Sequence, residues 1–180
     1  MHAPDAAPAP PPTALLVPVA VDIVALTIID ARLNVLVVDR ALEPFKGEAA
    51  LPGGFLLAGE QTMDAARREL AEETDYVAAT WNTLAEFYAS PGFTTEGARI
   101  FLAQDLSLLP EYQRTAREDE EAEFVPTWVR LDEALDAVMD GRRHNPSTVL
   151  GVLATAQARA RGWAGLRPAD APWLRSPESL

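Results

Sequence analysis

The chain has 180 residues, 48% of them hydrophobic, which is enough for one domain with a real core. It contains no cysteine, which excludes disulfides, thiolate metal sites and cysteine nucleophiles. Its formal net charge of −12 argues against a nucleic-acid backbone as a partner. We find neither an apolar run long enough for a membrane span nor a secretory signal, and therefore expect a cytoplasmic protein.

Residues 1–18 are rich in Ala and Pro, and we expect them to form a disordered tail before the predicted strands and helices. The predicted strands, rich in β-branched and aromatic residues, are residues 19–30, 35–39, 50–51, 81–89, 98–103 and 124–129. The last of these contains Pro126, which is typical of an edge strand or a bulge. The predicted helices are residues 62–74, 132–140 and 146–161.

The helix at residues 62–74 shows an apolar stripe and suitable end residues. Thr62 reads as its N-cap, and Asp64 suits the positive end of the helix dipole. Met63, Ala66 and Leu70 recur at helical spacing and predict the face that packs on the core.

Strands and helices are mixed along the chain, and hairpin-length links outnumber links that are long enough for a crossover. This pattern predicts an α+β or mixed α/β sandwich. We find no internal repeat and expect a single domain over residues 19–162, followed by a C-terminal tail at residues 163–180.

Three carboxylates share one face of the helix at residues 62–74. Glu69 lies three residues before Glu72 and four before Glu73, so their like charges repel when no cation is bound. Mg²⁺ prefers oxygen ligands, usually one or two carboxylates together with substrate phosphates and water. Gly53 and Gly54 form a tight turn just before this helix, where a backbone carbonyl can approach a metal closely because glycine has no side chain.

This stretch resembles the signature of the Nudix hydrolases: glycine, five residues, glutamate, seven residues, then R-E-U-x-E-E-x-G-U, where U is aliphatic. The residues in register are Gly54, Glu60, Arg68, Glu69, Leu70, Glu72 and Glu73. The resemblance implies a Nudix-type α/β/α sandwich with a mixed β-sheet, in which the box forms a loop–helix–loop. It also implies a hydrolase of diphosphates, with metal ligands at Glu69, Glu72, Glu73 and the Gly53 carbonyl, and a pairing of Arg68 with Glu60.

Two positions depart from the signature. Asp75 stands where the signature has glycine, and Tyr76 stands where it has an aliphatic residue. A residue just after a helix is often left-handed, a conformation that Asp accepts better than most residues. We therefore expect Asp75 to cost about 1 kcal/mol of stability without loss of a metal ligand.

Residues 90–96, which read SPGFTTE, resemble a segment of the ADP-ribose pyrophosphatases within the Nudix family. That resemblance implies substrate-binding residues at Pro91, Gly92, Phe93, Glu96 and Arg99, with Phe93 or a neighbouring aromatic stacking on adenine. A Pro-Gly pair is also a common turn, and a turn remains the alternative interpretation of Pro91 and Gly92.

In the ADP-ribose pyrophosphatases a glutamate of a distant acidic loop accepts the proton of the attacking water. The matching cluster here lies at residues 118–123, and Glu121 is our choice, followed by Glu120 and Glu123. A cluster of this kind is also typical of a solvated loop. With Glu69 and Arg68, Glu121 and Glu120 complete the predicted catalytic set.

The two resemblances together imply hydrolysis of ADP-ribose to AMP and ribose 5-phosphate with Mg²⁺, or with Mn²⁺ in its place. The alternatives are another nucleotide sugar or a dinucleotide as substrate, or a Nudix ligand sensor without catalysis, which would not need the three carboxylates. The expected partner is a small nucleoside diphosphate, with neither nucleic acid nor membrane. Many ADP-ribose enzymes exchange an N-terminal β-domain between subunits. Here a Pro-rich tail takes the place of that domain, so the sequence does not decide whether the protein forms a homodimer.

Overall fold

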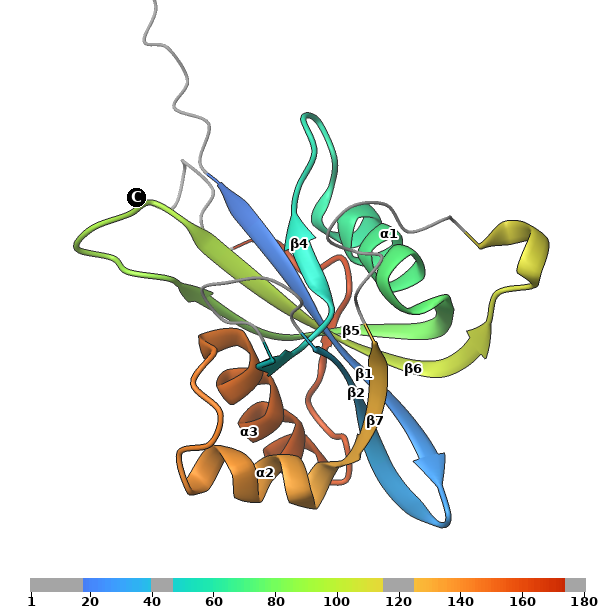
Figure 1. Cartoon of the computed structure of the whole chain (residues 1–180). Coiled ribbons are helices and arrows are strands. Elements are labelled where there is room, and N and C mark those ends of the chain that lie inside the picture. Colours follow the sequence, from blue (N-terminus) through green and yellow to red (C-terminus); the bar gives the residue numbers. More distant parts are fainter. Residues whose placement is uncertain (1–17, 40–46, 115–124, 174–180) are drawn as a thin grey trace, which may run out of the picture.

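The computed structural model of the protein describes residues 18–39, 47–114 and 125–173, which form a mixed β-sheet with helices on both faces (Figure 1). The strands are β1 (Val19–Ile29), β2 (Arg32–Asp39), β3 (Ala49–Ala50), β4 (Gly53–Phe55), β5 (Tyr76–Tyr88), β6 (Gly97–Leu108), β7 (Pro126–Arg130) and β8 (Arg167–Pro168). The helices are α1 (Thr62–Thr74), α2 (Leu131–Met139) and α3 (Pro146–Ala160), with a 3-10 turn at Glu111–Gln113.

The sheet runs in the order β3-β2-β1-β6-β5-β8, while β4 also pairs with β1 and β7 with β2. β1 and β6 are parallel, and the other pairings are antiparallel. β7 pairs only with β2 among the described strands, as its first residue, Pro126, leads one to expect. The expected mixed sheet is therefore confirmed.

Alternate residues of the central strands pack into two separate cores. On β1, Val21, Ile23 and Ala25 belong to the core beneath α1. Val24 and Leu26, which point to the opposite face, belong to the core beneath α2 and α3. Because side chains alternate along a strand, an unbroken apolar run supplies both faces of a sheet that is covered on both sides. The α1 layer and the α2–α3 layer of Figure 1 complete the predicted α/β/α sandwich.

Helix α1 occupies the predicted residues and buries the predicted stripe. Ala66 and Leu70 are fully buried, and Met63 packs against the same core. The assignment of Thr62 as N-cap was wrong, because the helix begins at Thr62 and the N-cap position falls on Gln61, whose side chain makes no capping bond. The acidic residue Asp64 lies in the first turn as expected.

Several strands are longer than predicted. β2 begins at Arg32 because Asp30 and Ala31, both at positive φ, complete the preceding turn in two residues. β5 begins at Tyr76, directly after α1, and its long pairing with β6 extends that strand to Leu108. The ring of Tyr76 meets Trp128 of β7 edge to face at 5.6 Å, which gives this departure from the Nudix signature a place in the core.

The described part of the expected C-terminal tail lies against the sheet. Residues Arg167–Pro168 form β8, which pairs with β5, and the Thr83 hydroxyl donates to the Pro168 carbonyl at 3.1 Å. Trp173 packs so close to Gly97 that a Cβ on that glycine would lie 2.9 Å from the indole ring. Residues 163–173 therefore add a strand and a cover to the sheet. No helix among the described residues is long and apolar enough to cross a membrane.

A substitution at the left-handed residue after α1 tests the account of this helix end. Asp75 has φ 61°, and its backbone N–H donates to the Ala71 carbonyl. Glycine adopts this conformation without strain, so we expect Asp75→Gly to leave the melting temperature level or to raise it by about 2–4 °C, with activity little changed. Differential scanning calorimetry and an activity assay measure both.

Asp105→Gly serves as the comparison variant. Asp105 also has positive φ, at 57°, but its carboxylate accepts a hydrogen bond from Thr80 that glycine would remove. We expect a smaller gain than for Asp75→Gly. A clear loss of activity in Asp75→Gly would show that this carboxylate has a functional role.

Candidate active site

The guanidinium of Arg68 binds the carboxylates around α1 to one another and to the preceding loop. Its Nε and Nη2 donate to the two carboxylate oxygens of Glu60, both at 3.0 Å. Its Nη1 donates to Glu69 at 2.9 Å and to Glu72 at 3.1 Å. A fifth bond, from Nη2 to the Phe55 carbonyl at 3.3 Å, reaches the end of β4. The planar fork of arginine suits such paired bonding, and the predicted pairing of Arg68 with Glu60 is present in this geometry.

These bonds shift the titration of the groups they join. Hydrogen bonding to Arg68 lowers the pKa of Glu60, and the Leu57 backbone N–H, 2.9 Å from the same carboxylate, adds to that effect. Hydrogen bonding to Glu60 in turn raises the pKa of Arg68. Both groups are therefore ionised at neutral pH, and the loop before α1 is held to the helix by a charge-assisted pair.

Glu69 is buried, with a residue exposure of 7%, and its carboxylate lies against the glycine turn. A Cβ built on Gly54 would lie 2.3 Å from the Oε1 atom of Glu69, closer than real atoms approach. Only glycine at this position leaves room for the carboxylate. The expected approach of a backbone carbonyl to a metal at this turn stays a prediction.

Glu73 is equally buried and faces the same turn. Its Oε2 atom accepts a hydrogen bond from the Gly53 backbone N–H at 3.1 Å. Gly53 is in turn confined by β1, because a Cβ there would lie 2.3 Å from the Val21 carbonyl oxygen. The structure thus brings Gly53, Glu69 and Glu73 together, with Arg68 and Glu72 beside them on the same helix.

The donor set at the turn fits a hard divalent cation in its chemistry. Glu69, Glu72 and Glu73 supply carboxylate oxygens, and the missing side chain of Gly54 makes the space in which the Glu69 carboxylate lies. In the described part of the chain, no three acidic or histidine side chains converge as they stand on a common ion position. Arg68 instead bonds to oxygens of Glu69 and Glu72. Cation binding would therefore require these carboxylates to reorient.

Asp22 is a candidate site residue that the sequence analysis did not single out. It lies on β1 opposite Gly53, and its Oδ2 atom accepts a hydrogen bond from the Ser147 hydroxyl of α3 at 2.6 Å. The pKa of Asp22 is raised to about 6, chiefly by burial and also by the nearby charges of Glu69 and Glu96, against the lowering effect of the bond from Ser147. A lone carboxylate within an otherwise apolar strand was the available sequence signal.

The loop at residues 90–96 forms an exposed turn between β5 and β6. The backbone N–H groups of Phe93 and Thr94 both donate to the Ser90 carbonyl at 2.9 Å. Phe93 is 94% exposed, so its ring lies open to solvent beside Pro91 and Gly92. Glu96 lies where the loop returns to the sheet, within electrostatic reach of Asp22. The turn conformation and an exposed stacking surface are both present in the same loop.

Arg99, the remaining predicted substrate-binding residue, is buried on the α1 face of the sheet. Its Nε donates to the Glu86 carboxylate at 2.7 Å, and a second guanidinium nitrogen bonds to the same oxygen. Trp173 stacks over the guanidinium at 4.8 Å, and Arg167 bonds to the other oxygen of Glu86 at 2.8 Å. In this arrangement the charge of Arg99 is satisfied inside the fold.

The acidic stretch that carries Glu120, Glu121 and Glu123 lies outside the described residues, which resume at residue 125. The chain leads into that stretch after the 3-10 turn at Glu111–Gln113 and leaves it directly before β7. The assignment of a base to this stretch stays a prediction.

Residues 18–148 match the NUDIX domain family. The chain is 38% identical over 131 residues to an ADP-ribose pyrophosphatase of Mycobacterium tuberculosis, covering 72% of this chain and 61% of that protein. It is 39% identical over 103 residues to an ADP-ribose pyrophosphatase of Bacillus subtilis, covering 57% of this chain and 54% of that protein.

Among solved structures, one described as an ADP compounds hydrolase superposes with a TM-score of 0.65 at 24% identity, covering 81% of this chain and 75% of that one. This likeness concerns the fold. The chain spans between half and two thirds of the length of the two curated relatives. The family match extends over most of the chain and includes every element that holds the Arg68 cluster, so this protein belongs to the Nudix family.

Proposed function

We propose that this protein hydrolyses the pyrophosphate bond of ADP-ribose to give AMP and ribose 5-phosphate, with Mg²⁺ or Mn²⁺ as its metal. The observation that carries the proposal is the pair of buried carboxylates, Glu69 and Glu73, held against the glycine turn beside Arg68. Two relatives described as ADP-ribose pyrophosphatases support the choice of substrate. We further propose a cytoplasmic enzyme that binds no nucleic acid, with a homodimer left open.

The proposed metal ligands are Glu69, Glu72, Glu73 and the Gly53 carbonyl. When bound, a divalent cation neutralises the charge of the diphosphate and acidifies the attacking water. Glu60 and Arg68 orient the helix face against the loop, as their paired hydrogen bonds indicate. Burial makes the ionised forms of Glu69 and Glu73 costly unless positive charge lies close by, which favours a cation beside them.

The remaining residues bind the substrate or accept the proton of the attacking water in this proposal. Glu121 accepts the proton of the attacking water, with Glu120 as the second candidate. The exposed ring of Phe93 stacks on adenine, and Pro91, Gly92 and Glu96 shape the loop around it. Arg99 contributes by fixing β6 beneath that loop through its bonds to Glu86.

Two alternatives remain distinct from this proposal. The first is another nucleotide sugar or a dinucleotide as substrate, and a phosphate-release panel over such compounds with Mg²⁺ and Mn²⁺ discriminates it. The second is a Nudix ligand sensor. The arrangement of Glu69 and Glu73 against the glycine turn favours catalysis over sensing, because ligand binding alone does not require buried carboxylates.

The glycine turn gives a direct test of metal binding. In Gly54→Ala the new Cβ would lie 2.3 Å from the Glu69 carboxylate, which must move. We expect the affinity for Mn²⁺, measured by isothermal titration calorimetry, to fall by about 10–100-fold. Gly92→Ala meets no atom within 4 Å and serves as the control. Equal Mn²⁺ affinity in Gly54→Ala and wild type would show that Glu69 is not a ligand.

Removing one carboxylate charge while keeping its shape tests the proposed metal chemistry. We expect Glu73→Gln to lower the hydrolysis rate by at least about 100-fold with unchanged circular dichroism. Excess chelator should abolish wild-type hydrolysis, and added Mg²⁺ should restore it. Full activity in excess chelator, or a loss below about threefold in Glu73→Gln, would contradict the assignment.

The choice of base is tested by comparing three glutamates in the acidic stretch. We expect Glu121→Gln to lower kcat by about 10²–10⁴-fold with little change in KM, because a base acts in the transition state. Glu120→Gln and Glu123→Gln should be milder. A large effect at Glu120 or Glu123 would transfer the role to that residue. Three variants near wild type would mean that the base lies elsewhere or that the metal-bound water needs none.

A further inference from the structure

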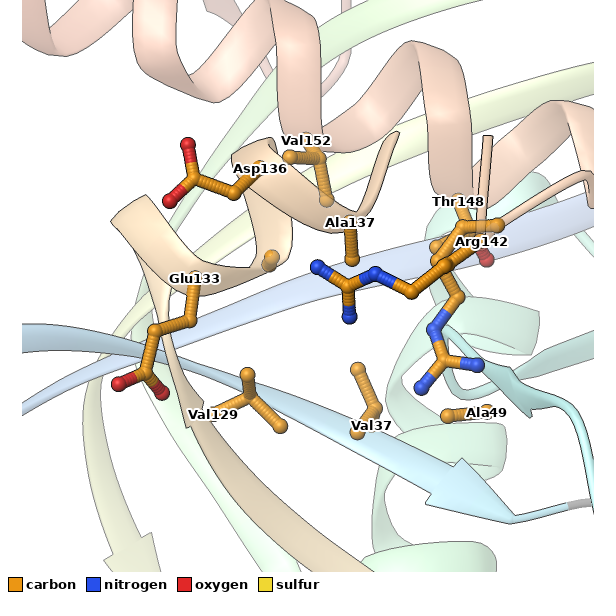
Figure 2. Close-up of a pocket in the computed structure, with 11 residues that line it drawn as sticks. Val37, Ala49, Val129, Glu133, Asp136, Ala137, Arg142, Thr148 and Val152 are labelled. Carbon is orange, nitrogen blue, oxygen red and sulfur yellow. The ribbon is translucent and has the colours of Figure 1, made fainter. Parts of the chain in front are cut away.

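A pocket of about 350 Å³ lies on the α2–α3 side of the sheet, whereas the carboxylates of the candidate active site belong to α1 on the other side (Figures 1 and 2). Its apolar floor is formed by Val37 of β2, Val129 of β7 and Val152 of α3. None of its lining residues belongs to the Nudix signature. The volume falls within the range of sites for small molecules, roughly 300–1,000 Å³.

The pocket has an acidic and a basic part. Glu133 and Asp136 line it from α2, and Arg142 and Arg143 line it from the segment between α2 and α3. In Figure 2 the Glu133 carboxylate lies beside Val129, whereas Arg142 lies toward Thr148. A ligand in this pocket therefore meets both positive charge and hydrogen-bond acceptors, with Asp136 within electrostatic reach of Arg142.

The backbone of the two arginines is fixed at the end of α2. The N–H groups of Arg142 and Arg143 both donate to the Ala137 carbonyl, at 2.9 and 3.1 Å. Arg142 uses Nε and Nη2 to bond to the exposed Asp140. No carboxylate of the described residues forms an ion pair with Arg143, which is half-buried in a chain of net charge −12. An anionic group would complete this end of the pocket.

We propose that the pocket binds a phosphate monoester that carries free hydroxyl groups, such as a sugar phosphate or a nucleoside monophosphate. Guanidinium groups bind phosphate oxygens through charge-assisted hydrogen bonds, and two arginines line this pocket. Glu133 and Asp136 accept hydrogen bonds from hydroxyl groups, and the valines contact the apolar face of the sugar or base. The end of α3 supplies no further anchor through Thr148, whose N–H is already capped by Asn145 at 2.9 Å.

Thr148 connects this pocket to the turn of the candidate active site. Its side chain lines the pocket, and its hydroxyl accepts a hydrogen bond from the Leu51 N–H at 3.3 Å, two residues before Gly53. The neighbouring Ser147 bonds to Asp22, which pairs with Gly53 across β1 and β4. Occupation of the pocket therefore acts on the position of Gly53. The proposal of a binding site is independent of the proposed hydrolase function. Only the effect of binding on the rate of hydrolysis rests on that function.

Calorimetric titration of the full chain in chelator tests the binding site, with AMP, ribose 5-phosphate, inorganic phosphate and adenosine as probes. We expect AMP or ribose 5-phosphate to bind saturably, with unchanged affinity in Glu73→Gln. Arg143→Gln should weaken this binding by at least about tenfold, as the loss of a charge-assisted hydrogen bond implies. Arg161→Gln, a change at an exposed arginine after α3, is the matched control and should bind as wild type.

The four probes test the basic and the acidic part of the pocket separately. Inorganic phosphate should bind more weakly than the monoesters, and adenosine should show no dependence on Arg143. The proposal is overturned if no monoester binds in chelator, if Arg143→Gln binds as wild type, or if the Glu73→Gln substitution removes the binding. Inorganic phosphate binding as tightly as AMP and ribose 5-phosphate would overturn the role given to the acidic part.

A kinetic measurement tests the effect of pocket binding on the rate of hydrolysis. With saturating substrate, the added monoester should change the kcat of wild type and of Arg161→Gln, and should leave the kcat of Arg143→Gln unchanged. An equal response in all three would overturn the coupling through Thr148. Because binding is measured without metal or turnover, an inactive protein that still binds the monoester would contradict the proposed function and leave the binding site supported.

Discussion

The organisation of the candidate active site depends on the guanidinium of Arg68. Glu69 and Glu72 lie on one helix face with Glu60 opposite them, and three carboxylates so close together would repel one another. The five donors of one arginine, held in a plane, satisfy all three and reach the end of β4 as well. The loop between β4 and α1 is thereby fixed to the helix, and the orientation of the carboxylates follows.

The glycine turn is held from both layers of the sandwich. On the α1 side, Glu73 accepts a hydrogen bond from the Gly53 N–H. On the α3 side, Thr148 accepts one from Leu51, and Ile23 of β1 donates to the Pro52 carbonyl at 2.8 Å. A displacement of either helix layer would therefore reach the turn, which is the physical basis for coupling the pocket to it.

Two residues that were predicted to bind substrate differ in their surroundings. Arg99 is paired inside the fold, whereas Phe93 is exposed. A buried charge is costly unless it is paired, and Arg99 meets this requirement with Glu86 beneath the ring of Trp173. Arg167 of β8 bonds to the same glutamate, so the cluster joins the C-terminal segment to β5 and β6. Phe93, by contrast, has no such cover and is available at the surface.

The sequence by itself determined the features that depend on local spacing. Helix α1, its apolar stripe and the common face of Glu69, Glu72 and Glu73 follow from the 3.6-residue repeat, and each is present over the predicted residues. The left-handed residue Asp75 follows equally from its place just after the helix. These properties need no partner from elsewhere in the chain.

The tertiary structure alone decided which distant residues meet. The bond between Asp22 and Ser147 spans 125 positions, and the contact of Arg99 with Trp173 depends on how the last described segment crosses the sheet. β5 begins at Tyr76 because a long neighbouring strand is there to pair with it and because Trp128 receives the tyrosine ring. The periodicity of the sequence predicts which face of an element a residue occupies. The partner of that residue depends on packing between elements that are far apart in sequence.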